Sequence, residues 1–244
     1  MRSWPATTAV IWFAALGASG APAGSGSIQG TPHDLSAVAG GAACSVCHTP
    51  PGAMPGTPLW SHTLSTAVYK IYESSSLAAK VGQPTGYSKL CLSCHDGTVA
   101  LTETLTGTTG GTYIPAGGAN LGTDLSDDHP ISFVYSSGLS AEDSQIRPPI
   151  GLPEPLKLDR SGELQCTTCH DAHNNHYGDF LVMSNARSQM CVSCHDMKGW
   201  ATSAHESSGV LVAGASDPYL RGGSGNARGG RMSCLSQAAR RRRP

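Results

Sequence analysis

A pentapeptide of two cysteines and a histidine, Cys-x-x-Cys-His, occurs four times in this 244-residue chain. Two thiols at this spacing can each add to one vinyl group of a haem, and the following histidine then binds the iron as an axial ligand. The four copies are Cys44, Cys47 and His48; Cys91, Cys94 and His95; Cys166, Cys169 and His170; and Cys191, Cys194 and His195. The sequence therefore predicts four covalently attached c-type haems.

A Cys-x-x-Cys pair alone is less specific, because it also occurs in zinc sites, in thioredoxin-like redox pairs and in short disulfides. None of these sites requires a histidine directly after the second cysteine, whereas all four copies have one. The haem interpretation is therefore preferred. A zinc-binding module is the last alternative, and any covalent haem would exclude it.

The second axial ligand of each iron decides the function. An iron with one protein ligand can bind a substrate, whereas an iron with two is closed and mainly transfers electrons. Six histidines lie outside the motifs, and we interpret His176 as a surface residue. The other five, in order of preference, are His129 and His62, then His33 and His205, then His173. Because enough histidines lie outside the motifs to give every iron a second ligand, we expect closed irons and a protein that is not an enzyme.

The first residues resemble an export signal. Arg2 is followed by the apolar run Ala9–Leu16 and by small residues up to Ala23, which predicts a signal peptide over residues 1–23. The run is shorter than the roughly 20 residues of a membrane span, so no span is expected after cleavage. We expect an exported protein at the cell surface or outside the cell, otherwise in the periplasm, where covalent haem attachment and an oxidising environment are found.

The composition predicts little regular structure. The chain has 30 Gly and 16 Pro, only 6% of its residues are aromatic, and no long amphipathic helix pattern is present. We expect a mostly irregular fold with short α-helices and few short strands, in which the haems of a multihaem cytochrome c form the core. Short helices are expected at the second and fourth motifs and over Ser65–Tyr72.

Two windows around the motifs indicate an internal duplication. Ser88–Asp96 and Ser188–Asp196 are identical at six of nine positions. We therefore predict a first two-haem unit over residues 24–150 and a second over residues 151–220, which begins in a proline-rich link.

The charges are distributed unevenly along the chain. Residues 24–220 hold 17 Asp and Glu against 8 Lys and Arg, and an acidic body is not expected to bind nucleic acid. Residues 221–244 form a Gly/Arg-rich tail with 7 Arg, no acid and one cysteine, Cys234. The tail is either a disordered basic segment with a free thiol or the product of a reading-frame shift that truncates a longer multihaem protein.

Several segments resemble one known family in type and in order, over about residues 31 to 217. They are His33–Ser36, Leu59–His62, Leu90–Val99, Asp124–Phe133, Cys166–His173 and Gly199–His205. The family is that of the surface tetrahaem cytochromes c of the OmcE type, whose subunits polymerise into extracellular filaments with a continuous haem chain. Pro51 is a departure, because relatives often have histidine in this place.

The resemblance implies that every iron has two histidine ligands. The four motif histidines would be proximal, and the distal set would come from His33, His62, His129, His173 and His205. In such filaments an adjacent subunit can supply one ligand, and His33 near the N-terminus is our candidate. The implied partners are identical subunits, together with electron-transfer proteins or extracellular acceptors.

Two other functions remain open. One is a soluble periplasmic tetrahaem shuttle with the same haems and no polymer. The other is a multihaem reductase that acts on a small nitrogen or sulfur oxyanion, which requires an open iron.

Overall fold

The computed structural model describes residues 27–40, 43–48, 59–105, 107–108 and 111–202. Regular elements in it are short, and irregular segments connect them. The α-helices are α1 (Ser36–Ala39), α2 (Gly86–His95), α3 (Ser137–Glu142), α4 (Cys166–Cys169) and α5 (Gln189–Cys194). The 3-10 helices are η1 (Ala43–Val46), η2 (Pro149–Gly151), η3 (Ala186–Ser188) and η4 (Trp200–Thr202). The strands are β1 (Glu103–Thr104), β2 (Gly107–Thr108), β3 (Phe133–Val134) and β4 (Glu163–Leu164). The predicted fold class is confirmed.

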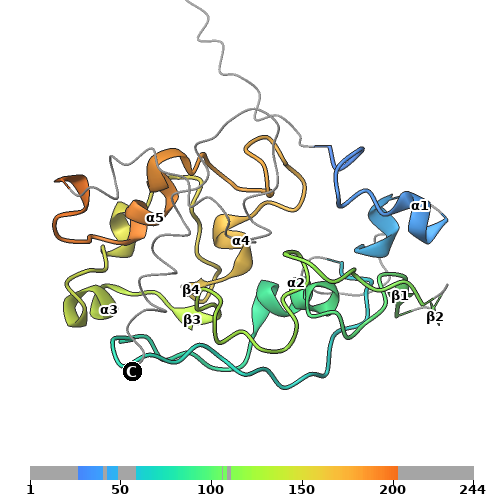
Figure 1. The fold of residues 1–244 in the computed structure, drawn as a ribbon, viewed down its shortest axis with the longest axis horizontal. Helices are drawn as coiled ribbons and strands as arrows, with labels where there is room; N and C mark the ends of the chain where they lie inside the picture. Colours follow the sequence, from blue (N-terminus) through green and yellow to red (C-terminus); the bar gives the residue numbers. More distant parts are fainter. Residues whose placement is uncertain (1–26, 41–42, 49–58, 106, 109–110, 203–244) are drawn as a thin grey trace, which may run out of the picture.

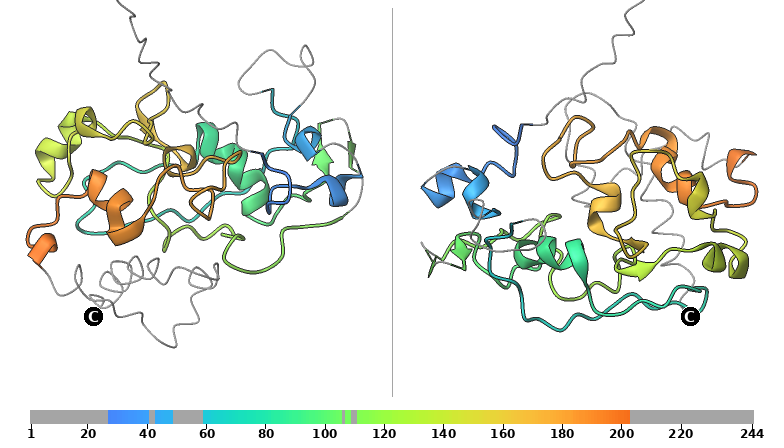
Figure 2. Two further views of the ribbon diagram at one scale, coloured as in Figure 1. Left: turned by 90° about the horizontal axis from the view of Figure 1, so that it is seen from above. Right: turned by 180° about the vertical axis from the view of Figure 1, so that it is seen from behind.

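The elements are spread along the long axis of the molecule, although not in the order of the sequence (Figure 1). Helix α1 and strands β1 and β2 lie at one end, α3 and α5 lie at the other, and α2 and α4 lie between them (Figure 1). The two views in Figure 2 show the same order from above and from behind. Within the described ranges, no helix combines the length and the hydropathy that a membrane crossing requires.

The described residues form two antiparallel strand pairs and two small apolar clusters. Strand β1 pairs with β2, and β3 pairs with β4 in a register that places Phe133 opposite Leu164. One cluster is built on Tyr69, Leu92 and Leu125, and the other on Phe133, Tyr135 and Leu164. The β3–β4 pair joins segments from both sides of residue 150, where we predict the boundary between the two units.

The predicted helix over Ser65–Tyr72 is wrong, because this segment is extended. The Lys70 N–H donates to the Thr123 carbonyl at 2.9 Å, and the Lys70 carbonyl accepts from the Leu125 N–H at 2.8 Å. A helix would need these same backbone groups for its own hydrogen bonds. Bonds to a distant segment therefore outweigh the local preference of this sequence.

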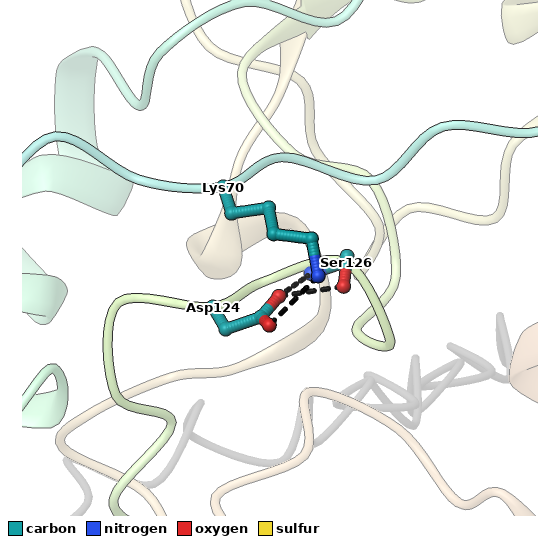
Figure 3. Close-up of polar contacts among 3 residues, drawn as sticks. All are labelled: Lys70, Asp124 and Ser126. Atoms are coloured by element: carbon teal, nitrogen blue, oxygen red, sulfur yellow. Dashed lines mark hydrogen bonds and ion pairs between the residues drawn. The ribbon is translucent and has the colours of Figure 1, made fainter.

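An ion pair reinforces this junction on its exposed side. Lys70 Nζ lies 2.9 Å from Asp124 Oδ2, and the Ser126 hydroxyl donates to Asp124 Oδ1 at 2.5 Å (Figure 3). The hydrogen bond from Ser126, followed by that from Lys70, lowers the pKa of Asp124 to about 2. The junction fixes the start of the segment that leads to His129.

A buried carboxylate holds the opposite side of the Tyr69 cluster. Asp96 is 3% exposed and accepts hydrogen bonds from the Tyr69 hydroxyl at 2.6 Å and from the N–H and hydroxyl of Thr98, each at 2.8 Å. Burial alone would raise the pKa of Asp96, but hydrogen bonds from Ser65, Tyr69 and Thr98 outweigh it and lower the pKa. Burial and this carboxylate together raise the pKa of Tyr69 to about 12.

We expect Tyr69→Phe to lower the free energy of unfolding by about 1–3 kcal/mol at neutral pH, because a buried charged acceptor loses a donor. The pKa of Asp96 is lowered in the folded chain, so its hydrogen bonds stabilise above the unfolded-state pKa of about 3.9 and lose this effect as the pH falls. The deficit of the variant should therefore shrink in acid. Denaturant unfolding of both proteins at several pH values measures this difference in the free energy of unfolding.

The control is Tyr113→Phe, because Tyr113 is 51% exposed and surface changes usually stay within about 0.5 kcal/mol. Equal stability of the Tyr69 variant and the native chain at neutral pH would show that the Tyr69–Asp96 bond contributes nothing.

Candidate haem-binding sites

Each Cys-x-x-Cys-His motif folds as a helical turn. In three copies the N–H of the motif histidine donates to the carbonyl of the first cysteine at 2.9 Å: His48 to Cys44, His170 to Cys166, and His195 to Cys191. The remaining copy forms the end of α2, which stops at His95. This turn brings both thiols and the histidine of a motif close together, as predicted for the helices at the second and fourth motifs.

A neighbouring segment fixes the backbone of each motif histidine. His48 forms an isolated bridge with Trp60, His170 with Leu181, and His195 with Ile146. The carbonyl of His95 accepts a hydrogen bond from the Leu121 N–H at 2.7 Å. The motif histidines therefore have defined positions although little of the surrounding chain is regular.

Histidine rings meet in three pairs, and each pair joins a motif histidine to a distant one. The ring centres of His33 and His95 are 6.0 Å apart, those of His48 and His173 are 6.0 Å apart, and those of His129 and His195 are 6.2 Å apart. A metal–imidazole bond is about 2 Å long, so two imidazoles on opposite sides of one metal have ring centres roughly 6 Å apart. The pairs therefore fit the two axial ligands of a haem iron.

Backbone carbonyls orient three of the paired rings and the ring of His170. The Nδ1 atom lies within hydrogen-bonding distance of a carbonyl oxygen in His33 (Ala172, 3.1 Å), His95 (Ala119, 2.7 Å), His129 (Pro130, 2.8 Å) and His170 (Asp179, 2.8 Å). A carbonyl can only accept, so Nδ1 carries the hydrogen and Nε2 is left to bind a metal. Burial also lowers the pKa of His33 and His195, which favours the neutral ligand form.

The paired histidines do not form a larger metal-ligand cluster in the described part of the chain. Among the residues that the structure describes, no three His, Cys, Asp or Glu side chains converge on one point. A structural zinc site takes four such ligands, whereas a haem iron takes one or two from the protein. The paired arrangement therefore favours the haem over the zinc alternative.

His62, which we rank among the first ligand candidates, lies in a different environment. The residue is 1% exposed, and its Nδ1 and Nε2 each lie 2.9 Å from a carbonyl oxygen, those of Thr63 and Ala100. Its Nε2 is also 3.4 Å from the Cys94 sulfur. Both ring nitrogens are thus engaged by the protein, which favours a structural role, and the ligand role of His62 stays a prediction.

The remaining histidines are the candidates for the second ligand of an iron bound by His170. Among the described residues His170 does not form such a 6.0–6.2 Å pair, although His33 lies near it, and His205 lies outside these residues. The His176 ring packs against Tyr177 with centres 4.6 Å apart. His33, our candidate for a ligand to another subunit, instead faces His95 of its own chain. The structure therefore does not support a role in trans for His33.

The thiols of successive motifs are neighbours. Burial and the nearby Cys47 raise the pKa of Cys94 to about 12, and burial and the nearby Cys194 raise that of Cys169 to about 12. Contact between Cys91 and Cys166 raises the pKa of Cys91 and lowers that of Cys166. The first motif thus lies next to the second, the second next to the third, and the third next to the fourth.

The indole N–H of Trp60 is a hydrogen-bond donor that a bound group near the first motif could use. Its indole Nε1 is buried and has no hydrogen-bond partner among the described residues. The ring lies edge-on to His48, with centres 6.3 Å apart. A haem carries two carboxylates, which are suitable acceptors for such a donor.

Comparison with known proteins agrees with this site. The family described as "Doubled CXXCH motif" matches residues 160–199, which include the third and fourth motifs. This match supports a multihaem c-type cytochrome that binds haem covalently and transfers electrons. No curated protein matches the chain.

Three alanine variants of the loaded protein distinguish the roles of the histidines. His129→Ala removes one ring of a pair, so we expect part of the haem absorbance to change from low spin to high spin. His62→Ala should lower the free energy of unfolding without a high-spin band. His176→Ala is the matched control, and its spectrum should be that of the native protein.

Optical spectra and thermal unfolding of the three purified variants measure these changes. A high-spin band in the His62 variant would make His62 an axial ligand and contradict the structural role. An unchanged spectrum of the His129 variant would contradict the His129–His195 pair.

Proposed function

We propose that this chain carries four c-type haems and relays electrons between irons that histidines hold from both sides. The three imidazole pairs with centres 6.0–6.2 Å apart carry this proposal, because an iron closed by two protein ligands has no position for a substrate. The bound haems supply reversible one-electron chemistry, and the chain itself orients the ligands. No substrate is transformed.

The proximity of the thiols of successive motifs supports transfer through the whole chain. These thiols join the motifs in sequence order, from the first to the fourth. Haems attached to these cysteines would therefore be neighbours, and an electron would not have to cross a long gap within the subunit.

We further propose that the subunits assemble into an extracellular conductive filament. The resemblance to the OmcE type supports this assembly. The His170 ring supports it as well: its Nδ1 is fixed by the Asp179 carbonyl, and among the described residues it does not form one of the 6.0–6.2 Å histidine pairs. A histidine of an adjacent subunit would complete this iron and link the haem chains of two subunits.

The same observation favours one second function, a reductase whose open iron is the one bound by His170. Carbon monoxide binds a reduced haem iron only at an open position. Binding to one iron per chain in the native protein would support the reductase. Binding that appears only after His205→Ala would instead identify His205 as the missing ligand.

We expect electron microscopy of the exported protein to show filaments, and mass spectrometry of the same sample to show four haems per chain. Four haems are expected because every motif has both thiols and its histidine. Single particles with four haems would favour the periplasmic shuttle. Fewer than four haems would contradict the proposed relay.

A further inference from the structure

Gln165 directly precedes Cys166 and lies between the helices of the second and third motifs, with 1% of its surface exposed. Its Oε1 accepts hydrogen bonds from the Ser88 N–H at 3.1 Å, from the Ser88 hydroxyl at 2.6 Å and from the Ser132 hydroxyl at 3.1 Å. Ser88 belongs to α2, so the side chain connects the start of α4 to the helix that ends in the second motif.

The amide nitrogen of the same side chain is equally occupied. Gln165 Nε2 donates to Asp159 Oδ2 and to Glu163 Oε2, each at 3.0 Å. The backbone at Gly86 approaches so closely that an added Cβ would lie 2.8 Å from Nε2, and its φ of +50° also favours glycine. Both amide hydrogens and the carbonyl oxygen of Gln165 are therefore used within a tightly packed site.

These hydrogen bonds lie next to two haem-attachment cysteines. Ser88 precedes Cys91 by one helical turn, and its hydroxyl accepts from the Cys166 N–H at 3.0 Å. Helices α2 and α4 pack together, and the Cys91 and Cys166 thiols lie near each other. The side chain of Gln165 thus holds in register the two sulfur atoms to which the second and third haems would be attached.

We propose that Gln165 is the positioning residue for electron transfer between the second and third haems. It acts through Ser88 on the Cys91 side and through its own backbone on the Cys166 side. This inference rests on the proposed relay function and adds the residue that keeps its central step short. Loss of the Gln165 amide would separate the two attachment points and slow exchange between these haems alone.

The test compares variants of the haem-loaded protein. Gln165→Met has a similar length and removes all five hydrogen bonds of the amide. One electron is injected photochemically, and its equilibration among the haems is followed by absorbance. A second readout, which does not depend on electron transfer, is hydrogen exchange of the Ser88 and Cys166 amides. We expect a several-fold lower equilibration rate and a loss of protection at both amides.

Gln83→Met is the matched control. Gln83 bonds through Oε1 and Nε2 to the N–H and carbonyl of Tyr69, each at 2.8 Å, and therefore anchors the backbone away from this junction. It should lose stability while electron equilibration keeps its native rate. Equal slowing in both variants would overturn the proposal, because the effect would then be general destabilisation.

A compensated variant tests the hydrogen-bond pattern itself. Gln165→Glu combined with Asp159→Asn and Glu163→Gln exchanges donors and acceptors across the same contacts, so it should restore both the rate and the amide protection. A native rate in Gln165→Met despite lost protection would overturn the proposal, and so would slow equilibration in a compensated variant with restored protection.

Should Gln165→Met fail to accumulate, Ser132→Ala removes one hydrogen bond from the amide oxygen, together with the bonds of this hydroxyl to the Thr85 backbone. It should slow equilibration to a smaller extent, and an unchanged rate would overturn the positioning role. Failure of the relay function itself would look different, because the native protein would then lack haem or show no equilibration.

Discussion

An iron with two histidine ligands requires two imidazoles to face each other, and here the partners lie far apart in the sequence. Among the paired rings, those of His33, His95 and His129 are each fixed by a backbone carbonyl from their own surroundings. Segment 119–121 contacts His95 twice: the His95 ring donates to the Ala119 carbonyl at 2.7 Å, and the His95 carbonyl accepts from the Leu121 N–H at 2.7 Å. Segment 179–181 does the same for His170. Such rings keep their orientation without a contribution from a large apolar core.

Buried polar groups replace much of that core. Gln165 and Asp96 are 1% and 3% exposed, and each is surrounded by partners that use its hydrogen-bonding capacity. A fully satisfied buried network is rigid and specific, because any displacement leaves a desolvated polar group unpaired. Such networks suit a chain rich in glycine and proline, since they need only a few well-placed side chains.

The sequence predicts the chemistry of this protein better than its geometry. Two thiols and a histidine within five residues specify haem attachment locally, and the composition indicates short elements, so both could be predicted. The pairing of His48 with His173 could not, because it depends on how distant loops pack. Gln165 was missed for the same reason: a single glutamine before a motif gives no signal, and its role appears only with Ser88 beside it.

One wrong sequence prediction shows how tertiary contacts override a local pattern, and one histidine shows what its own stretch of sequence does not reveal. The segment Ser65–Tyr72 has no strong breaker and reads as a helix, yet its backbone pairs with residues 123–125. His62 lies two residues after Trp60 and is a ligand candidate in the sequence; its ring is buried with both nitrogens near carbonyl oxygens, and its ligand role stays a prediction. Neither burial nor distant pairing can be deduced from one short stretch of residues.

The third motif is the junction of the proposed relay. Its Cys166 contacts the second motif, its Cys169 lies near the fourth, and His173, three residues after its motif histidine, faces His48 of the first. Electrons that pass between the two halves of the chain would therefore pass at or beside the iron bound by His170. The second ligand of that one iron separates the candidate functions: a closed iron makes the junction a point of transfer, and an open iron makes it a place where the electrons could leave the chain for a bound molecule.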